Sequence, residues 1–316
     1  MPRGRREPRG MIVSVRDNIA MALEAGSIAD ACRLVGVDAV EWHCDRDGAL
    51  APLAMAGGAR HAVFTPNGLA HAAADRERTG LHVPAMLLAT DFNREDPTAE
   101  RDWVVRATEA AATLGIPALR IDAAMTGERD LPLAERQDRF ADAMREIVER
   151  TNGLPVVFGI ENHGIQGNDP EFLEGLMDRV GSTRLGMTLD TGNFYWAGHP
   201  LSTVYDILER LAPRTMHTHV KNIAYPPERR EERRPAGWEY GTYVCPIPDG
   251  DIDHARVVAA LAAAGYSGDL CIEDESLDRF PPARRVEHVR AAADHLHACI
   301  AAAAGNSRPD ERVMMN

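Results

Sequence analysis

The sequence predicts a protein of the α/β class in which the 316-residue chain forms a single closed (β/α)8 barrel. Short apolar segments rich in β-branched residues alternate with amphipathic segments along the chain, as parallel strands alternate with helices. In the second half, Glu161, Asp190 and His219 follow three such strands at intervals of 29 residues. One strand, one helix and two loops need about that length. Eight repeats in one domain favour a closed barrel over an open doubly wound sheet.

The composition fits one globular domain and argues against two classes of function. Hydrophobic residues make up 45% of the chain, enough for a sizeable core. The net charge of −13 disfavours a nucleic-acid surface, since phosphate binding depends on basic residues. No apolar run approaches the ~20 residues that span a bilayer. Five separated cysteines without a CxxC pair indicate reduced thiols in a cytoplasmic protein.

The first half of the chain contains four expected strands and three expected helices. The strands are expected at residues 11–15, 37–42, 83–89 and 118–121. The helices are expected at residues 18–34, 66–79 and 97–114. Gly26 is expected to interrupt the first helix. Thr65-Pro66 and Asp96-Pro97 place a capping residue before a proline, which is typical of a helix start.

The second half continues the alternation and then departs from it once. Further strands are expected at residues 155–160, 185–189, 215–220 and 268–272. Helices are expected at residues 131–151, from Asp169-Pro170 onward, and at 201–211, 251–264 and 281–302. Between them, residues 223–250 are rich in Pro, Arg and Glu without a clear period. Such a segment is typical of a long loop or lid, or of disorder.

The ends of the chain differ in composition from the expected barrel. Residues 1–10 contain four arginines but lack the apolar stretch of a secretory signal, which predicts a disordered leader. Residues 305–316 are polar and are expected to form a flexible tail. The catalytic barrel is therefore expected to span residues 11–304.

Polar residues follow the expected strands, and parallel strands in a barrel bring their C-terminal ends to one mouth. Four of these residues come from the last four strands: Glu161, Asp190, His219 and Glu273. Three neighbouring carboxylates would repel one another without a cation. With one imidazole they suit a divalent ion and leave coordination positions open. The sequence therefore predicts one divalent metal, with Mn2+ foremost and Mg2+, Co2+ or Zn2+ as alternatives.

Other residues at the strand ends have simpler explanations. His217 precedes His219 by two residues, so it faces the same side one layer deeper and is expected to be a packed supporting residue. Glu41, Asp91 and Asp122 follow strands at positions where an acidic side chain often caps the next helix.

Five short motifs give the chain a resemblance to a known family. They occupy residues 36–41, 160–163, 189–193, 217–222 and 265–273. With these motifs, residues 11 to 302 resemble the xylose-isomerase-like TIM barrel superfamily, the sugar phosphate isomerase/epimerase family, which is related in fold to endonuclease IV. The resemblance implies one divalent metal on Glu161, Asp190, His219 and Glu273, with the two glutamates acting as acid and base. Asn193, where ketose epimerases often have histidine, and the long 223–250 segment depart from the simple ketose epimerases.

The family includes ketose 3-epimerases, hydroxypyruvate isomerase, inosose dehydratase and lyases of 3-keto sugars. The resemblance therefore predicts a metal-dependent isomerase or epimerase acting on a sugar or keto-sugar through a metal-bound enediolate. Glu161 and Glu273 would remove and return a proton next to the carbonyl. The alternative is a dehydratase or lyase acting on a keto-inositol or 3-keto-glycoside, with His163 or Lys221 as the acid for the leaving group. Lys221 is alternatively a hydrogen-bond donor to the substrate.

The remaining candidates concern substrate binding. Asn162, Asn193 and Asn222 are expected to bind sugar hydroxyls, with helix capping as the alternative explanation. Arg120 is a candidate for binding a substrate phosphate. His43, which lies at a strand end, is a further candidate for substrate binding. An abasic-site endonuclease would need further histidines and a basic face. A noncatalytic binding protein would be expected to lose a metal ligand, and none is lost. We expect a small-molecule sugar substrate and no nucleic-acid or membrane partner, and leave a homo-oligomer open.

Overall fold

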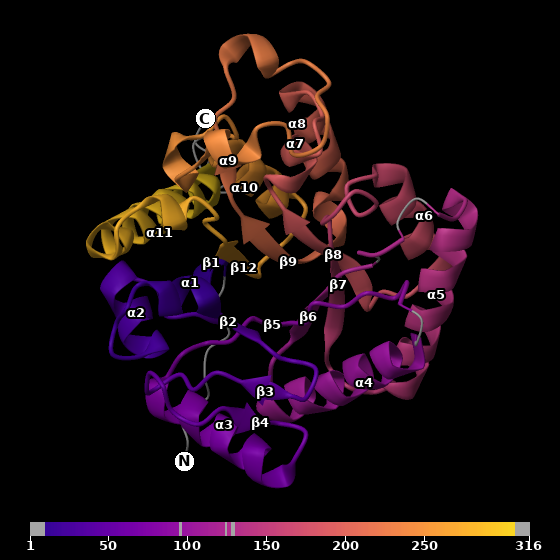
Figure 1. The fold of residues 1–316 in the computed structure, drawn as a ribbon, viewed down its shortest axis with the longest axis vertical. Coiled ribbons are helices and arrows are strands. Elements are labelled where there is room, and N and C mark those ends of the chain that lie inside the picture. Colours follow the sequence, from indigo (N-terminus) through magenta and orange to yellow (C-terminus); the bar gives the residue numbers. More distant parts are fainter. Residues whose placement is uncertain (1–9, 95–96, 124, 128–129, 307–316) are drawn as a thin grey trace, which may run out of the picture.

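The structure, a computed structural model, describes residues 10–94, 97–123, 125–127 and 130–306. Eight parallel strands close into a barrel in the order β1-β12-β9-β8-β7-β6-β5-β2, with helices around the outside (Figure 1). The barrel strands are β1 (Ile12–Arg16), β2 (Val40–His43), β5 (Ala85–Leu87), β6 (Ala118–Ile121), β7 (Val157–Glu161), β8 (Leu185–Asp190), β9 (Thr215–Val220) and β12 (Asp269–Ile272). The predicted (β/α)8 barrel is confirmed.

Helices follow the strands and cover the barrel. They are α1 (Asp17–Ala22), α2 (Ile28–Val35), α3 (Pro66–Thr79), α4 (Pro97–Leu114), α5 (Leu133–Arg150), α6 (Pro170–Val180), α7 (Asn193–Trp196), α8 (Leu201–Leu211), α9 (Tyr240–Tyr243), α10 (His254–Ala263) and α11 (Pro282–Asn306). Short 3-10 turns lie at Ala212–Arg214, Pro227–Arg229, Ile247–Asp249 and Leu277–Arg279. Two small antiparallel pairs lie outside the barrel: β3 (Ala49–Leu50) with β4 (His61–Ala62), and β10 (Asn222–Ile223) with β11 (Val244–Cys245). No described helix is long and apolar enough to cross a membrane.

Local signals account for most helix boundaries. The expected helix at 18–34 is two helices, because Ser27 caps α2 by accepting a hydrogen bond from the Asp30 backbone N–H at 3.0 Å. Thr65 caps α3 in the same way. Asp96, the expected cap of α4, lies outside the described residues, as do nearly all of the expected leader and tail. The tail's first two residues still belong to α11.

The strand register brings the polar side chains of the barrel mouth to neighbouring positions. Glu161 of β7 is opposite Thr188 of β8, and Asp190 of β8 is opposite His219 of β9. Below Glu161, Gly159 leaves room for a neighbour, because a Cβ at this position would clash with Thr188 Oγ1. The pairing of β7, β8 and β9 therefore brings polar side chains from successive strands to the same end of the barrel.

Residues 223–250 form a packed structure rather than an unstructured loop. Their chain begins in β10, returns through β11 and lies over the end of the molecule that carries α7 and α8 (Figure 1). Tyr225 is buried, and its ring contacts Tyr195 at a centroid distance of 4.9 Å. Arg234 is also buried, with its guanidinium 4.5 Å from the Tyr195 ring and 4.2 Å from the Tyr225 ring. Arg234 is therefore a packing residue of this segment, unlike its exposed neighbour Arg233.

Candidate metal centre

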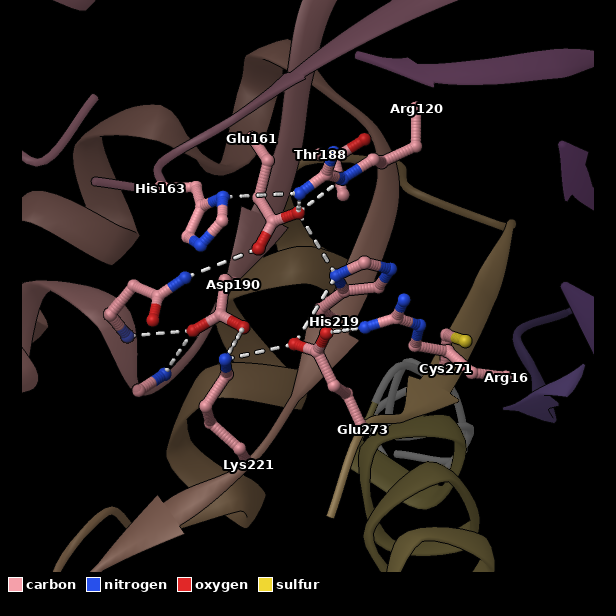
Figure 2. Close-up of polar contacts among 12 residues, drawn as sticks. Arg16, Arg120, Glu161, His163, Thr188, Asp190, His219, Lys221, Cys271 and Glu273 are labelled. Carbon is pink, nitrogen blue, oxygen red and sulfur yellow. Dashed lines mark hydrogen bonds and ion pairs between the residues drawn. The ribbon is translucent and has the colours of Figure 1, made fainter. Parts of the chain in front are cut away.

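Four side chains from neighbouring strands converge at the mouth of the barrel (Figure 2). Glu161 ends β7, Asp190 ends β8, His219 lies near the end of β9, and Glu273 directly follows β12. One atom from each of these four lies within 4.8 Å of the others, and all four residues are buried. The structure therefore brings together the four residues that the sequence predicted as metal ligands.

Three of these residues have a buried polar atom without a hydrogen bond among the described residues: Asp190 Oδ2, His219 Nδ1 and Glu273 Oε2. Buried polar atoms are rarely left without partners. Lys221 Nζ partly offsets the negative charge, lying 2.9 Å from Glu273 Oε2 and 3.3 Å from Asp190 Oδ2. Carboxylate oxygens and an imidazole nitrogen at one point are suitable ligands for a divalent cation. The residues present therefore fit the predicted metal.

The orientation of Asp190 is fixed by its surroundings. Its Oδ1 accepts hydrogen bonds from the backbone N–H groups of Gly192 at 2.8 Å and Asn193 at 2.6 Å. The Asn162 amide bonds the Asp190 backbone on both sides, donating to its carbonyl at 2.9 Å and accepting from its N–H at 2.8 Å. Oδ2 is consequently the oxygen left to face the other ligands. Asn162 thus supports Asp190 through the backbone.

Each of the two glutamates has its own arginine. Arg120 donates to Glu161 Oε2, and its Nη1 also lies 2.5 Å from Asp122 Oδ2. Arg16 donates to Glu273 Oε1 from the end of β1. Sequence reasoning missed Arg16, although its place at the end of a barrel strand follows the same rule that found the ligands.

These surroundings give the ligands different proton affinities. Burial opposes ionisation of Glu161, but Arg120 and His219 outweigh it and hold the pKa of this carboxyl well below its ordinary value. For Glu273, burial is likewise outweighed, by Lys221, His219 and Arg16, so its pKa is also well below the ordinary value. Burial raises the pKa of Asp190 to about 8, although Lys221 acts in the opposite direction. The two glutamates are therefore ionised at neutral pH.

His163 and Asp122 form a second polar pair beside the ligands. His163 Nδ1 lies 2.9 Å from Asp122 Oδ1, and the His163 side chain is 43% exposed. Burial lowers the pKa of His163, but the hydrogen bond to Asp122 and the charge of Glu161 outweigh it, so the net pKa is raised. Arg120 connects this pair with Glu161, because its guanidinium pairs with both Asp122 and Glu161. Figure 2 shows His163 and Arg120 beside Glu161. His163 therefore lines the cavity with a raised pKa.

The cavity above the ligands has a volume of about 570 Å³, a size typical of small-molecule sites. Its lining includes the charged side chains of Arg16, Arg120 and Lys221 and apolar side chains such as Ile19 and Leu87. The 223–250 segment reaches its edge: the Tyr240 hydroxyl lies 2.7 Å from Glu275 Oε2, and Glu275 in turn pairs with Lys221. The segment is thus connected to the candidate site.

The predicted substrate-binding residues are placed in different ways. Arg120 and Asn193 lie at the ligands, with Asn193 Nδ2 3.2 Å from Glu161 Oε1. The Asn222 amide is fully used by backbone groups, donating to the carbonyls of Ile247 and Ile252 and accepting from two N–H groups. This favours a structural role for Asn222, because no polar atom remains for a sugar. His43 is absent from the cavity lining and lies 3.7 Å from Asp45.

Comparison with known proteins gives one family and many similar folds. Residues 29–299 match the model of the family described as xylose isomerase-like TIM barrel. A curated relative, an uncharacterized protein of Methanocaldococcus jannaschii, is 27% identical over 150 residues, which cover 46% of this chain and 46% of that protein. The match thus spans about half the length of this relative.

Solved structures of similar fold cover nearly the whole chain. A xylose isomerase domain protein from Alicyclobacillus acidocaldarius is 19% identical with a TM-score of 0.66, over 93% of this chain and 100% of that one. An L-ribulose 3-epimerase is 16% identical with a TM-score of 0.65, over 95% and 99%. The IolI protein with a bound zinc atom is 16% identical with a TM-score of 0.62, over 94% and 99%. At these identities the likeness establishes the fold.

Proposed function

Because this chain belongs to the xylose isomerase-like TIM barrel family, we propose that it is a divalent-metal-dependent isomerase or epimerase acting on a sugar or keto-sugar. The observation that carries the proposal is the convergence of Glu161, Asp190, His219 and Glu273, three of which have a buried atom without a hydrogen bond. The similar folds of an L-ribulose 3-epimerase and of a zinc-containing IolI protein support it. Five free cysteines fit a cytoplasmic location.

The four converging residues would hold the cation, for which we propose Mn2+ first and Mg2+, Co2+ or Zn2+ as alternatives. The bound cation would act as a Lewis acid that stabilises negative charge at the substrate's carbonyl oxygen. Asn193, next to Glu161, and Lys221, next to Glu273, would donate hydrogen bonds to substrate oxygens. Arg120 is mainly engaged by Glu161 and Asp122, so its role toward a substrate phosphate is secondary.

Glu161 and Glu273 carry out the proton transfer in this proposal. They stand on either side of Asp190 and His219 (Figure 2), so they can face a substrate from two directions. Their lowered pKa values keep both carboxylates in the ionised form that a general base requires at neutral pH. One glutamate would remove the proton from the carbon next to the carbonyl. The other would take up a proton from the solvent and deliver it to the opposite face, so one proton is lost and one is gained. This exchange inverts the configuration at that carbon.

The His163–Asp122 pair favours a second candidate, a dehydratase or lyase on a keto-inositol or 3-keto-glycoside. His163 lines the same cavity, and its pKa is raised because Asp122 and Glu161 outweigh the effect of burial. It can therefore donate a proton to a departing hydroxyl or glycosidic oxygen after a glutamate has removed the proton next to the carbonyl. Loss of water or of an alcohol would distinguish this outcome from epimerisation.

The test is deuterium incorporation from D2O into a panel of 2-keto sugars, 3-keto-glycosides and keto-inositols, with Mn2+ added. Incorporation next to the carbonyl is expected by NMR, and mass spectrometry separates epimers from elimination products. Glu161→Gln and Glu273→Gln keep an oxygen but lose basicity, so each should slow the exchange by about 10²- to 10⁴-fold while retaining part of its metal affinity. Glu209→Gln, which alters a surface pair with Arg256, is the control.

Two results would contradict the proposal. Exchange at the wild-type rate in both Gln variants would place the base elsewhere, with His163 and Lys221 the next residues to replace. Turnover of a panel member without exchange of any proton next to the carbonyl would exclude epimerisation through solvent-exchanging carboxylates.

A further inference from the structure

His219 uses its two ring nitrogens on two different sides. Its Nδ1 faces the proposed metal ligands, 3.2 Å from Glu161 Oε2 and 3.4 Å from Glu273 Oε2. Its Nε2 faces the barrel interior, 3.0 Å and 3.1 Å from the two carboxylate oxygens of Glu41. The carboxylate of Glu41 can only accept hydrogen bonds when it is ionised. A proton on Nε2 is therefore directed to Glu41, and Nδ1 is directed to the ligands.

Glu41 is itself held from several directions. It is 1% exposed, and its Oε1 lies 2.8 Å from His217 Nε2. Arg16 Nε lies 3.4 Å from Glu41 Oε2, while Nη1 of the same guanidinium pairs with Glu273. Arg16 thus connects Glu41 to one of the proposed ligands. The carboxylate has no freedom to rotate away from His219 without breaking these contacts.

The contacts continue from His217 to Asp269 of β12 and Ser14 of β1, which lie on the barrel strands between β2 and β9. His217 Nδ1 lies 2.7 Å from Asp269 Oδ1, and Asp269 Oδ2 accepts a hydrogen bond from Ser14. The residues of this chain of contacts come from β1, β2, β9 and β12, and all are buried. The imidazole of His217 therefore has a carboxylate on each nitrogen, which fixes the ring that holds Glu41.

A second ion at this level is a weaker explanation of the same cluster. Glu41, His217, His219 and Cys271 offer ligand atoms within 4.8 Å of one another. However, tetrahedral zinc bonds of about 2.0 Å hold neighbouring N and O ligands about 3.3 Å apart. The distances of 2.8 and 3.0 Å from Glu41 Oε1 to the two Nε2 atoms are those of hydrogen bonds. The cluster supports the metal centre above it and does not form another.

We propose that Glu41 is a positioning residue of the metal centre: it accepts the Nε2 proton of His219, fixes the ring, and leaves Nδ1 as the ligand atom. His217 and Arg16 hold Glu41 in place. The inference rests on the proposed metal-dependent function. Its physical basis is that a ligand histidine whose second nitrogen donates to a carboxylate is held in one tautomer and is a stronger ligand.

The test compares Mn2+ and Zn2+ affinities of chelator-treated wild type and Glu41→Gln, measured by competition with a chelating dye. The Gln amide presents an NH2 group to one of the donors, so the affinity should fall by about 10- to 100-fold. Glu100→Gln is the matched control, because Glu100 is also 1% exposed and paired with an arginine, Arg46, but lies on α4. Its metal affinity should stay within about twofold of wild type.

A spectroscopic measurement separates positioning from general destabilisation. In the Zn2+-loaded wild type labelled with 15N-histidine, the His219 ring should carry its proton on Nε2 and have its Nδ1 shifted by the metal. In Glu41→Gln this Nε2–H signal should shift or split, whereas the Glu100→Gln spectrum should match wild type. His217→Gln removes one contact of Glu41 and should lower the metal affinity less than Glu41→Gln does. It replaces Glu41→Gln in the test if that variant does not fold.

The possible failures are distinguishable. Wild type that binds neither ion would overturn the metal-dependent function itself. Tight binding in wild type with equal affinity in Glu41→Gln, or a metal on His219 Nε2 with the proton on Nδ1, would overturn only the role of Glu41.

Discussion

At the scale of single residues, the least predictable contacts are those that cross the barrel. The four ligands could be predicted because each ends a strand, and strand ends meet at one mouth. Glu41 lies within strand β2 and does not cap a helix, and its contact with His217 joins positions 176 apart in the sequence. The local sequence around Glu41 is equally compatible with a residue that caps a helix. Arg16 has its partner Glu273 still farther away, and nothing nearby in the sequence marks it as part of the site.

Asn222 is another residue whose contacts could not be predicted from the sequence. Its position directly after the histidine strand made it a candidate for binding a sugar hydroxyl. The direction of its amide depends on the backbone of residues 247–252, which return to the barrel only after a long excursion. A side chain whose partners are backbone groups of an irregular segment has no sequence signature.

His254 gives a residue-scale prediction about pH. It begins α10, is 1% exposed, and burial, with His295 nearby, lowers its pKa from 6.5 to about 3. Between these values the unfolded chain binds a proton that the folded chain does not, so stability rises with pH and is lost as pH falls below 6.5. When the pH falls from 7 to 5, the unfolding free energy of His254→Leu should therefore decrease by about 2 kcal/mol less than that of wild type.

Urea unfolding at the two pH values measures this difference. His297→Leu, an exposed histidine on α11, is the control and should follow wild type. Equal pH dependence of wild type and His254→Leu would show that His254 does not contribute to acid sensitivity.

At the scale of elements, regular strands and capped helices were predictable and residues 223–250 were not. Capping residues, prolines and glycines mark most helix ends locally. The strands β10 and β11 have two residues each, too few to show a period. Aromatic residues fix the segment, with Trp238 stacked on Tyr243 at a centroid distance of 5.5 Å. Their spacing follows neither a helix nor a strand, so the packing was not visible in the sequence.

Arg234 gives an element-scale prediction, because it connects this segment to α7 and its flanks. Its guanidinium donates to the backbone carbonyls of Tyr195, Arg229 and His199. Arg234→Ala would leave buried carbonyls without partners and remove the contacts with two aromatic rings. We expect the unfolding free energy to fall by about 2 to 4 kcal/mol and residues 223–250 to exchange amide hydrogens faster.

Arg233→Ala is the neighbouring control, since Arg233 is exposed, and it should change the unfolding free energy by less than about 0.5 kcal/mol. If both variants behave alike in denaturant and in hydrogen exchange, Arg234 does not hold the segment.

At the scale of the whole molecule, the fold places opposite charges together at one mouth. The chain has a net charge of −13, yet Arg16, Arg120 and Lys221 all lie among the carboxylates that line the cavity. These cations keep the site folded around buried acids, while Asp190 Oδ2, His219 Nδ1 and Glu273 Oε2 make no hydrogen bond among the described residues. The proposed function requires an ion at the point where those three atoms meet.

Metal content therefore tests the central claim most directly. Protein purified without chelator and dialysed against Mn2+ should contain close to one equivalent of divalent metal per chain by elemental analysis. Asp190→Ala should lose it, because the variant removes the ligand whose orientation is fixed by Gly192, Asn193 and Asn162. Asp138→Ala, a surface carboxylate paired with Arg179, should keep the full equivalent. A full equivalent that survives in the Glu161→Ala, Asp190→Ala double variant would contradict the account.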